Sequence, residues 1–169
     1  MAPGLCEIAT FRCTAPSFPN ACQVCEVEID PETGRIMPVG HWAVDDVGFE
    51  INPKLVKGQV QGGIAQSLGQ CLMEFIHFEE EDGQLLTGSF MDYAMPRASD
   101  MCGIAVSSHP VITQSNPLGA KGVGEAGAVG ALPAVANAVA DALSPLGIDH
   151  IDMPMTPQTV WHAIQKAKR

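Results

Sequence analysis

The chain has 169 residues, of which 46% are hydrophobic and 17% charged, and its formal net charge at pH 7 is -10. This length and apolar share support one folded core and exclude a disordered chain. The acidic balance argues against a nucleic-acid-binding protein, because a phosphate-binding surface needs clustered lysine and arginine. Only 5% of the residues are aromatic, so we expect a second polypeptide or a large ligand to complete much of the apolar surface.

The chain is predicted to form one module preceded by an irregular arm. Residues 1–20 are interpreted as the proline-containing arm and residues 21–169 as the folded module. No basic stretch followed by an apolar run marks a signal peptide, and no stretch approaches the ~20 apolar residues that cross a bilayer. We therefore expect a cytoplasmic protein without a membrane span, in which the cysteines are reduced thiols. The cysteines are Cys6, Cys13, Cys22, Cys25, Cys71 and Cys102.

Two strands are predicted at about 24–29 and 36–44, joined by a turn that contains proline and glycine. Cys22 and Cys25 have the spacing of half a metal site. However, the stretch 21–30 alternates like a strand, in which residues three apart point to opposite faces. No second cysteine pair stands at zinc or iron–sulfur spacing, so we expect no metal at this pair.

A long helix is predicted over about 53–75, with Asn52 as its N-cap. Small residues occupy one narrow face of this helix, and larger apolar residues lie opposite. The small residues are Gly58, Gly62, Ala65 and Gly69. Beside them run the amides of Gln59, Gln66 and Gln70, which can donate and accept hydrogen bonds, as recognition of a heterocycle's edge requires. Packing of the small residues against another helix is the alternative.

The remaining elements alternate extended segments with helices. They are a hairpin turning at Asp82 and Gly83, an extended piece over 103–111, an alanine-rich helix over 126–143, a strand near 148–151 and a helix over 156–168. Pro133 marks either a kink in the alanine-rich helix or its true start. The predicted fold class is α+β, a mixed sheet with packed helices.

One glutamate, Glu125, stands in a loop in which almost every neighbour between Lys121 and Gly130 is glycine or alanine. Glycine lets backbone approach backbone or ligand closely, and the lack of bulk leaves the carboxylate reachable. A carboxylate in a small, water-poor cavity is a candidate general base. The alternative is a carboxylate at a helix start that interacts with the helix dipole.

The same loop permits a nucleotide-binding interpretation. Gly122, Gly124 and Gly127 satisfy the pattern of a dinucleotide-binding loop, and Asp149 lies downstream where a ribose-binding acid would stand. However, the preceding segment is not an apolar strand, and Glu125 would place negative charge beside a pyrophosphate. A nucleotide-binding module therefore stays the second interpretation.

Six ordered motifs resemble a known family. They are 44–48, 52–53, 58–69, 86–93, 116–127 and 153–157. Together they are similar to the C-terminal part of the molybdenum-binding large subunit of the xanthine dehydrogenase, aldehyde oxidase and carbon monoxide dehydrogenase family of molybdenum hydroxylases. The resemblance covers about 16–164 and implies that the α+β fold is the C-terminal portion of a molybdopterin-binding domain.

The resemblance implies roles for four residues. Glu125 corresponds to the active-site base, and Gln66 corresponds to the glutamine that contacts the metal–pterin centre. Backbone contacts around the glycine loop fall at Gly124 and Ala126. The implied cofactor is molybdenum–molybdopterin in its cytosine dinucleotide form, shared with a partner chain, and no residue of this chain is expected to ligate the metal.

The resemblance also implies partners and a substrate class. The partners would be the remainder of the molybdenum subunit, an iron–sulfur subunit with [2Fe-2S] clusters and a flavoprotein subunit with FAD. The substrate would be a small molecule of the aldehyde, N-heterocycle or carbon monoxide class. A complete molybdenum subunit is several times longer, so we expect the chain to be inactive alone. A non-catalytic assembly remnant of the same fold is the remaining alternative.

Overall fold

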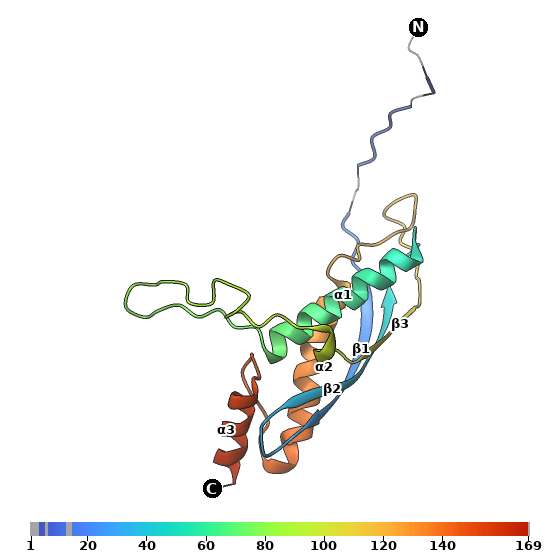
Figure 1. Ribbon diagram of the computed structural model, residues 1–169. Helices are drawn as coiled ribbons and strands as arrows, with labels where there is room; N and C mark the ends of the chain where they lie inside the picture. The colour runs from blue at the N-terminus through green and yellow to red at the C-terminus, as the bar shows by residue number, and fades with distance from the viewer. Residues whose placement is uncertain (1–3, 6, 13–14, 169) are drawn as a thin grey trace.

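A mixed three-stranded sheet with two helices against one face forms the body of the protein (Figure 1). The computed structural model describes residues 4–5, 7–12 and 15–168. Its elements are β1 (Asn20–Ile29), β2 (Ile36–Asp46), α1 (Pro53–Leu72), β3 (Gly103–Ser108), α2 (Ala126–Leu143) and α3 (Pro157–Ala167), with short 3-10 turns at Ala98–Asp100 and Ser144–Leu146. β1 pairs with β2 antiparallel, and β2 pairs with β3 parallel. The predicted α+β fold with a mixed sheet is confirmed.

The hairpin between β1 and β2 forms where the sequence predicts it. The side chain of Asp30 accepts hydrogen bonds from the backbone N of Glu32 (2.9 Å) and from Oγ1 of Thr33 (2.6 Å). Gly34 closes the turn with φ at 72°, which glycine adopts without steric cost. β1 begins at Asn20, earlier than predicted, so it uses part of the segment that was interpreted as an irregular arm.

The packing face of α1 is the one that the sequence predicts. Val60, Ile64 and Leu68 are fully buried. A Cβ at Gly58 or Gly62 would meet open space, so this part of the small-residue face is bare. The side chain of Asn52 accepts from the backbone N of Lys54 and Leu55, as predicted for an N-cap. The helix ends at Leu72 rather than near residue 75, because the amides of the next two residues close its last turn on the carbonyl of Gly69.

Helices α1 and α2 meet through glycines other than those that the small-residue pattern indicates. A Cβ at Gly127 would clash with the carbonyl of Val60, and one at Gly63 would lie 2.8 Å from the backbone N of Ala128. The backbones of the two helices therefore touch directly. Pro133 lies inside α2, which keeps the predicted bounds of 126–143. Residues from both helices, β2, α3 and the segment before α3 form the core: Ala43, Val60, Ile64, Leu68, Cys71, Leu72, Ala131, Val135, Val139, Leu143, Ile148, Met155, Val160 and Ile164.

The strand predicted near residues 148–151 is wrong. Gly147, which follows the 3-10 turn after α2, has φ at 74°, and the next residues form an irregular segment that pairs with no strand. Ile148 is buried, which explains the apolar pattern, but the next backbone bond to another element runs from Met155 N to the carbonyl of Cys71 at the end of α1. The helix that follows, α3, is present close to its predicted bounds, and Thr156 is its N-cap.

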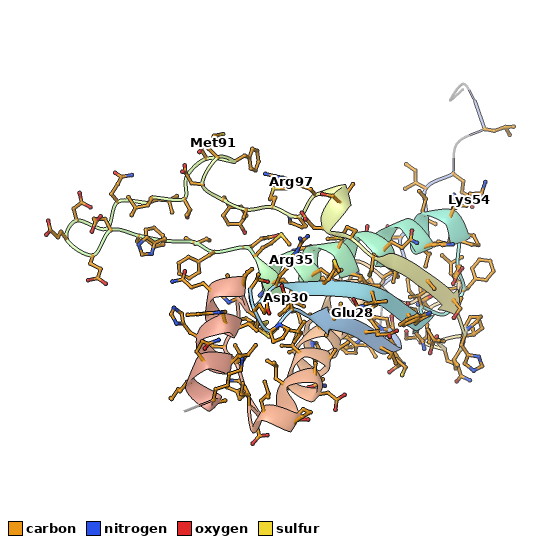
Figure 2. All side chains as sticks on the ribbon, turned by 60° about the horizontal axis from the view of Figure 1, so that its bottom comes forward. Glu28, Asp30, Arg35, Lys54, Met91 and Arg97 are labelled. Carbon is orange, nitrogen blue, oxygen red and sulfur yellow. The ribbon has the colours of Figure 1, made fainter. Side chains whose placement is uncertain are left out.

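A long loop between α1 and the first 3-10 turn extends away from the body, and Met91 lies on it (Figures 1 and 2). The predicted hairpin turn at Asp82 and Gly83 is present, with an isolated antiparallel bridge between Phe78 and Leu85. The turn therefore joins irregular segments rather than two regular strands.

Helix α2 differs from the expectation that no stretch could cross a bilayer. Residues 126–146 are long and apolar enough by length and composition to do so. One such helix is weak evidence for a membrane span, because a core helix passes the same test. Ala131, Val135, Val139 and Leu143 of α2 are buried in the core of this chain.

Candidate functional site

Glu125 lies immediately before α2, in the wall of a cavity of about 660 Å³. Gly124 and Ala126 line the same cavity, so with Glu125 the structure brings together three of the four residues that the family resemblance implies. Glu125 is exposed, and its side chain makes no capping hydrogen bond to the helix. The carboxylate is therefore directed to no partner among the described residues and is available to a ligand.

The glycine loop is anchored to the end of β2. Oδ2 of Asp46 lies 2.5 Å from Nζ of Lys121, and Oδ1 accepts from the backbone N of Gly48 (3.0 Å) and Val111 (2.9 Å). The backbone N of Lys121 donates to the carbonyl of Val47 (2.8 Å). These contacts fix the residue from which the loop starts.

The charge state of the Asp46 carboxyl group favours its ion pair with Lys121. Burial alone would raise the pKa of its carboxyl group, but the hydrogen bond from Lys121 and the backbone donors lower the pKa well below its usual range. The side chains of Lys121 and Asp46 are only 10% and 13% exposed. Asp46 therefore remains ionised and paired throughout the neutral range.

The amides along α1 occupy two different places. Nε2 of Gln59 donates to the carbonyl of Gly124 at 2.7 Å, so this glutamine holds the loop itself. Gln66 is exposed on α1, two turns or about 10 Å further along the helix, and does not line the cavity of Glu125. The structure thus places Gln66 on an open surface, where an external group can reach its amide.

Another part of the cavity wall is formed by residues that the sequence analysis did not select. The segment 17–21, which leads into β1, lines the cavity together with the glycine loop. Phe18 is 72% exposed within it. The only local signal for Phe18 is its place beside a proline just before a strand. This signal does not predict that the folded chain brings Phe18 to the glycine loop.

Asp45, next to Asp46, was also missed. Its side chain is 2% exposed, and neither carboxylate oxygen has a hydrogen-bond partner among the described residues. Burial, and to a lesser extent the nearby charge of Glu50, raises the pKa of Asp45. The pKa values of the two neighbouring aspartates are therefore shifted in opposite directions, that of Asp46 downward by its hydrogen bonds and the charge of Lys121, and that of Asp45 upward by burial.

The thiols do not form a metal centre in the part of the chain that the structure describes. No group of three His, Cys, Asp or Glu side chains there could hold a metal ion. Burial raises the pKa of the thiols of Cys25 and Cys71 to about 11, which leaves them protonated and unreactive at neutral pH. Cys6 and Cys13 lie outside the described residues.

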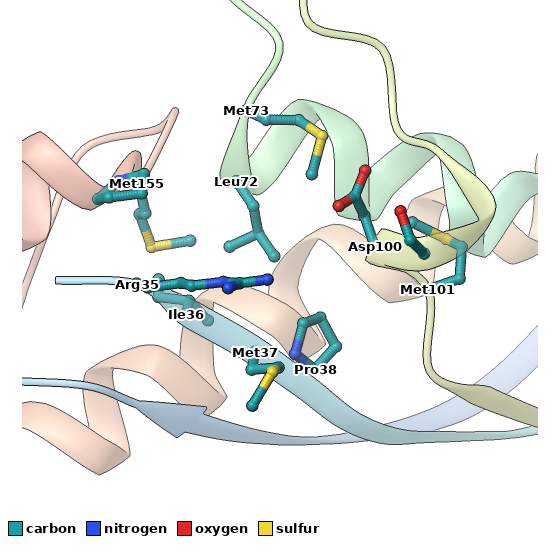
Figure 3. Close-up of a pocket in the computed structure, with 11 residues that line it drawn as sticks. Arg35, Ile36, Met37, Pro38, Leu72, Met73, Asp100, Met101 and Met155 are labelled. Carbon is teal, nitrogen blue, oxygen red and sulfur yellow. The ribbon is translucent and has the colours of Figure 1, made fainter. Parts of the chain in front are cut away.

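A second cavity, of about 410 Å³, lies at the other end of α1 (Figure 3). Arg35 extends into it between Leu72 and the start of β2, and Asp100 and several methionines complete its wall. No residue of the glycine loop lines it. The candidate chemistry therefore lies in the cavity of Glu125 and not here.

The geometry disfavours the nucleotide-binding interpretation. No regular strand leads into the loop, where a dinucleotide-binding fold requires one. Gly127 serves the contact with α1, and Asp149 lines a different cavity from Glu125. The three glycines of the pattern therefore do not form a phosphate-binding turn.

The cavity of Glu125 fits a large cofactor with polar edges. Its volume falls within the range of about 300–1,000 Å³ that is usual for ligand sites. A Cβ at Gly122 or Gly124 would meet open space, so a ligand can approach the loop backbone. Gly124 and Ala126 line the cavity and could hold the cofactor through the backbone, whereas Gln66 lies outside it and could bind only a part of the cofactor that extends along α1.

Comparison with known proteins gives a consistent result. Residues 5–102 match a family described as "Molybdopterin cofactor-binding domain". The chain is 31% identical to the carbon monoxide dehydrogenase large chain of Hydrogenophaga pseudoflava, over 98% of this chain and 20% of the relative. It is 36% identical to the nicotine 6-hydroxylase large subunit of Paenarthrobacter nicotinovorans, over 95% of this chain and 20% of the relative.

A solved structure shares the fold. Reconstituted carbon monoxide dehydrogenase from Oligotropha carboxidovorans superimposes with a TM-score of 0.85 and 33% identity, over 89% of this chain and 18% of that chain. The chain thus spans about a fifth of the length of the curated relatives that it matches.

Proposed function

This chain belongs to the molybdopterin-binding large-subunit family of molybdenum hydroxylases, as a part of that subunit, and from this premise we propose that Glu125 is its catalytic base. The observation that carries the proposal is the uncapped carboxylate of Glu125 in the wall of a cavity of about 660 Å³, beside an open glycine backbone. The chain supplies one wall of the molybdopterin site, and a partner chain supplies the rest.

Each residue of the site has a separate task. Glu125 accepts a proton at its carboxylate, which as general-base catalysis contributes about 10²–10⁴ in rate. The backbone of Gly124 and Ala126 and the amide of Gln66 bind the cofactor. Lys121 and Asp46 hold the loop in place. The molybdenum–molybdopterin group, when bound, supplies the two-electron oxidation of the substrate.

The substrate and partners follow from the same premise. The relatives are named for carbon monoxide and nicotine, so the proposed substrate is a small molecule of the carbon monoxide, N-heterocycle or aldehyde class. The proposed partners are the remainder of the molybdenum subunit, a [2Fe-2S] subunit and an FAD subunit, with the cofactor in its cytosine dinucleotide form. The assembly is proposed to be cytoplasmic, and the chain alone to be inactive.

The test is to prepare the assembly with and without this chain. Molybdenum content and the bleaching of iron–sulfur absorbance after addition of an aldehyde, an N-heterocycle or carbon monoxide are measured. We expect both to require the chain. An assembly that keeps full metal content and substrate reduction without the chain would contradict the proposal. For the isolated chain, a rise in melting temperature with NAD or ATP would favour the nucleotide-binding alternative instead.

A further inference from the structure

Gln23 on β1 holds the first turn of α2 through its side-chain amide. Nε2 of Gln23 donates to the carbonyls of Ala126 (3.3 Å) and Gly127 (3.2 Å), the two residues that follow Glu125. Gly130 leaves room for this contact, because a Cβ there would lie 2.6 Å from Nε2 of Gln23. The start of α2 is therefore shaped around one glutamine of the sheet.

His41 on β2 fixes the orientation of that glutamine. Its Nε2 lies 2.9 Å from Oε1 of Gln23, and the imidazole is fully buried. Carbonyl oxygens only accept, so the NH₂ of Gln23 must face α2 and its Oε1 must face His41. Nε2 of His41 must then carry a proton and donate it. The three groups form a directed chain of hydrogen bonds from the sheet core to the start of α2.

The backbone on the other side of Glu125 is held as well. Gln59 donates to the carbonyl of Gly124, so amides from α1 and from β1 fix the peptide groups that flank the glutamate. We propose that Gln23 and His41 are positioning residues, which set the direction in which Glu125 enters its cavity. This inference rests on the proposed role of Glu125 as the base.

The hydrogen bonds from Gln23 act on the first turn of α2, the part of the helix that its own backbone bonds hold least. The first turn of a helix lacks the preceding hydrogen bonds that hold its interior, and the side chain of Glu125 provides no cap here. The first backbone bond of the helix runs from Val129 N to the carbonyl of Glu125 at 3.0 Å. Loss of the Gln23 bonds frees this turn to shift without unfolding the rest of α2.

The first experiment compares Gln23→Met with Gln61→Met in the full chain. Gln61 is a matched control, since its Nε2 donates to the carbonyl of Ile104 (3.0 Å) away from the loop. Hydrogen exchange of the amides of Val129 and Gly130 should become roughly tenfold faster in Gln23→Met. Exchange at Val139 should not change. Equal hydrogen-exchange rates at the first turn of α2 in both variants would show that Gln23 does not hold this turn.

The second experiment tests the positioning role in the assembled enzyme. Gln23→Met should slow the limiting rate of reduction by substrate about tenfold, with substrate affinity and molybdenum content unchanged, because a small misplacement of a catalytic group costs rate. His41→Phe should give the same pattern. A wild-type reduction rate in Gln23→Met, together with faster exchange, would overturn the positioning role. If no substrate reduces the wild-type assembly, the proposed role of Glu125 as the base is contradicted. The hydrogen-exchange result still shows whether Gln23 holds the first turn of α2.

Discussion

Oδ2 of Asp46 lies 2.5 Å from Nζ of Lys121, and this contact joins the end of β2 to the start of the glycine loop, 75 residues later in the chain. Both side chains are largely buried, so solvent screens the pair little. The position of Glu125 therefore depends on an ion pair that no local sequence pattern identifies.

Lys121→Met should destabilise the chain. Removing one partner of a buried pair leaves the charge of Asp46 uncompensated, which costs about 3 kcal/mol. The measurement is the urea midpoint at neutral pH. Lys54→Met is the control, because Lys54 is exposed on α1 and forms no ion pair among the described residues. Equal midpoints for the two variants would show that the pair contributes no stability.

Asp45→Asn should change the pH dependence of stability. Because the pKa of Asp45 is raised by burial, its contribution to stability is fully present below its ordinary pKa of about 4 and is lost as pH rises through the raised value. Asparagine cannot ionise, so the variant should gain on the wild type as pH rises above about 4, by roughly 1–3 kcal/mol once Asp45 is ionised in the folded wild type. Thermal unfolding across this range measures the difference.

The exposed Asp141 on α2 provides the control, as Asp141→Asn. Parallel pH curves for wild type and Asp45→Asn would mean that Asp45 does not ionise in this range. The contribution of Asp46 to stability has the opposite pH dependence. Because its pKa is lowered, this contribution is present above about pH 4 and is lost as pH falls further.

The parts of the fold that could be predicted depend on local signals. Asn52 and Thr156 cap α1 and α3 through their own side chains, and the turn around Gly34 is formed by neighbouring residues. The prediction of a strand near 148–151 is wrong because alternating apolar residues do not reveal whether a sheet edge is available for pairing. Apolar residues there pack on the core from an irregular segment.

The candidate site was predictable only in part, for the same reason. Glu125 stands out in its loop because of its glycine neighbours. Gln23 and Asp46 act on that loop from strands about 75–100 residues earlier. Their roles depend on tertiary contacts, which a single sequence does not display.

Gln66→Leu should lower cofactor retention without unfolding the chain. The side chain is exposed on α1, so its loss leaves no buried group unpaired in the chain itself. In the assembled enzyme, loss of the amide would leave a cofactor group unpaired, at a cost of about 1–3 kcal/mol. Molybdenum content after gel filtration is the measurement, with Gln158→Leu on α3 as the control. Wild-type metal content and spectra would remove Gln66 from the site.

The isolated chain should self-associate through the sheet face that the helices leave bare. Apolar side chains on this face are about half exposed: Val24, Met37, Val39, Trp42 and Val44. Patches of this kind normally mark interfaces. Light scattering and binding of a hydrophobic dye should both decrease in Trp42→Gln. Trp161→Gln, on α3, should change them less. A wild-type chain that stays monomeric and binds no dye would contradict the expectation of a partner.

Glu125→Gln should abolish reduction by substrate while leaving the assembly intact. Glutamine keeps the shape and hydrogen bonding of the side chain but cannot accept the proton, so the change separates chemistry from packing. Glu125 is exposed and makes no capping bond, so the variant should unfold at the wild-type temperature. General-base catalysis contributes about 10²–10⁴ in rate, and the loss should be at least of this size.

The assembled Glu125→Gln enzyme should contain normal molybdenum and pterin, and its iron–sulfur clusters should still be reduced by dithionite. Only reduction by substrate should fail, which stopped-flow absorbance measures in a single turnover. Glu7→Gln is the control, because Glu7 is exposed in the N-terminal segment and does not line the cavity. Near-normal reduction of Glu125→Gln by substrate, with metal content confirmed, would show that the carboxylate is not the base and that its place beside the cavity has no catalytic consequence.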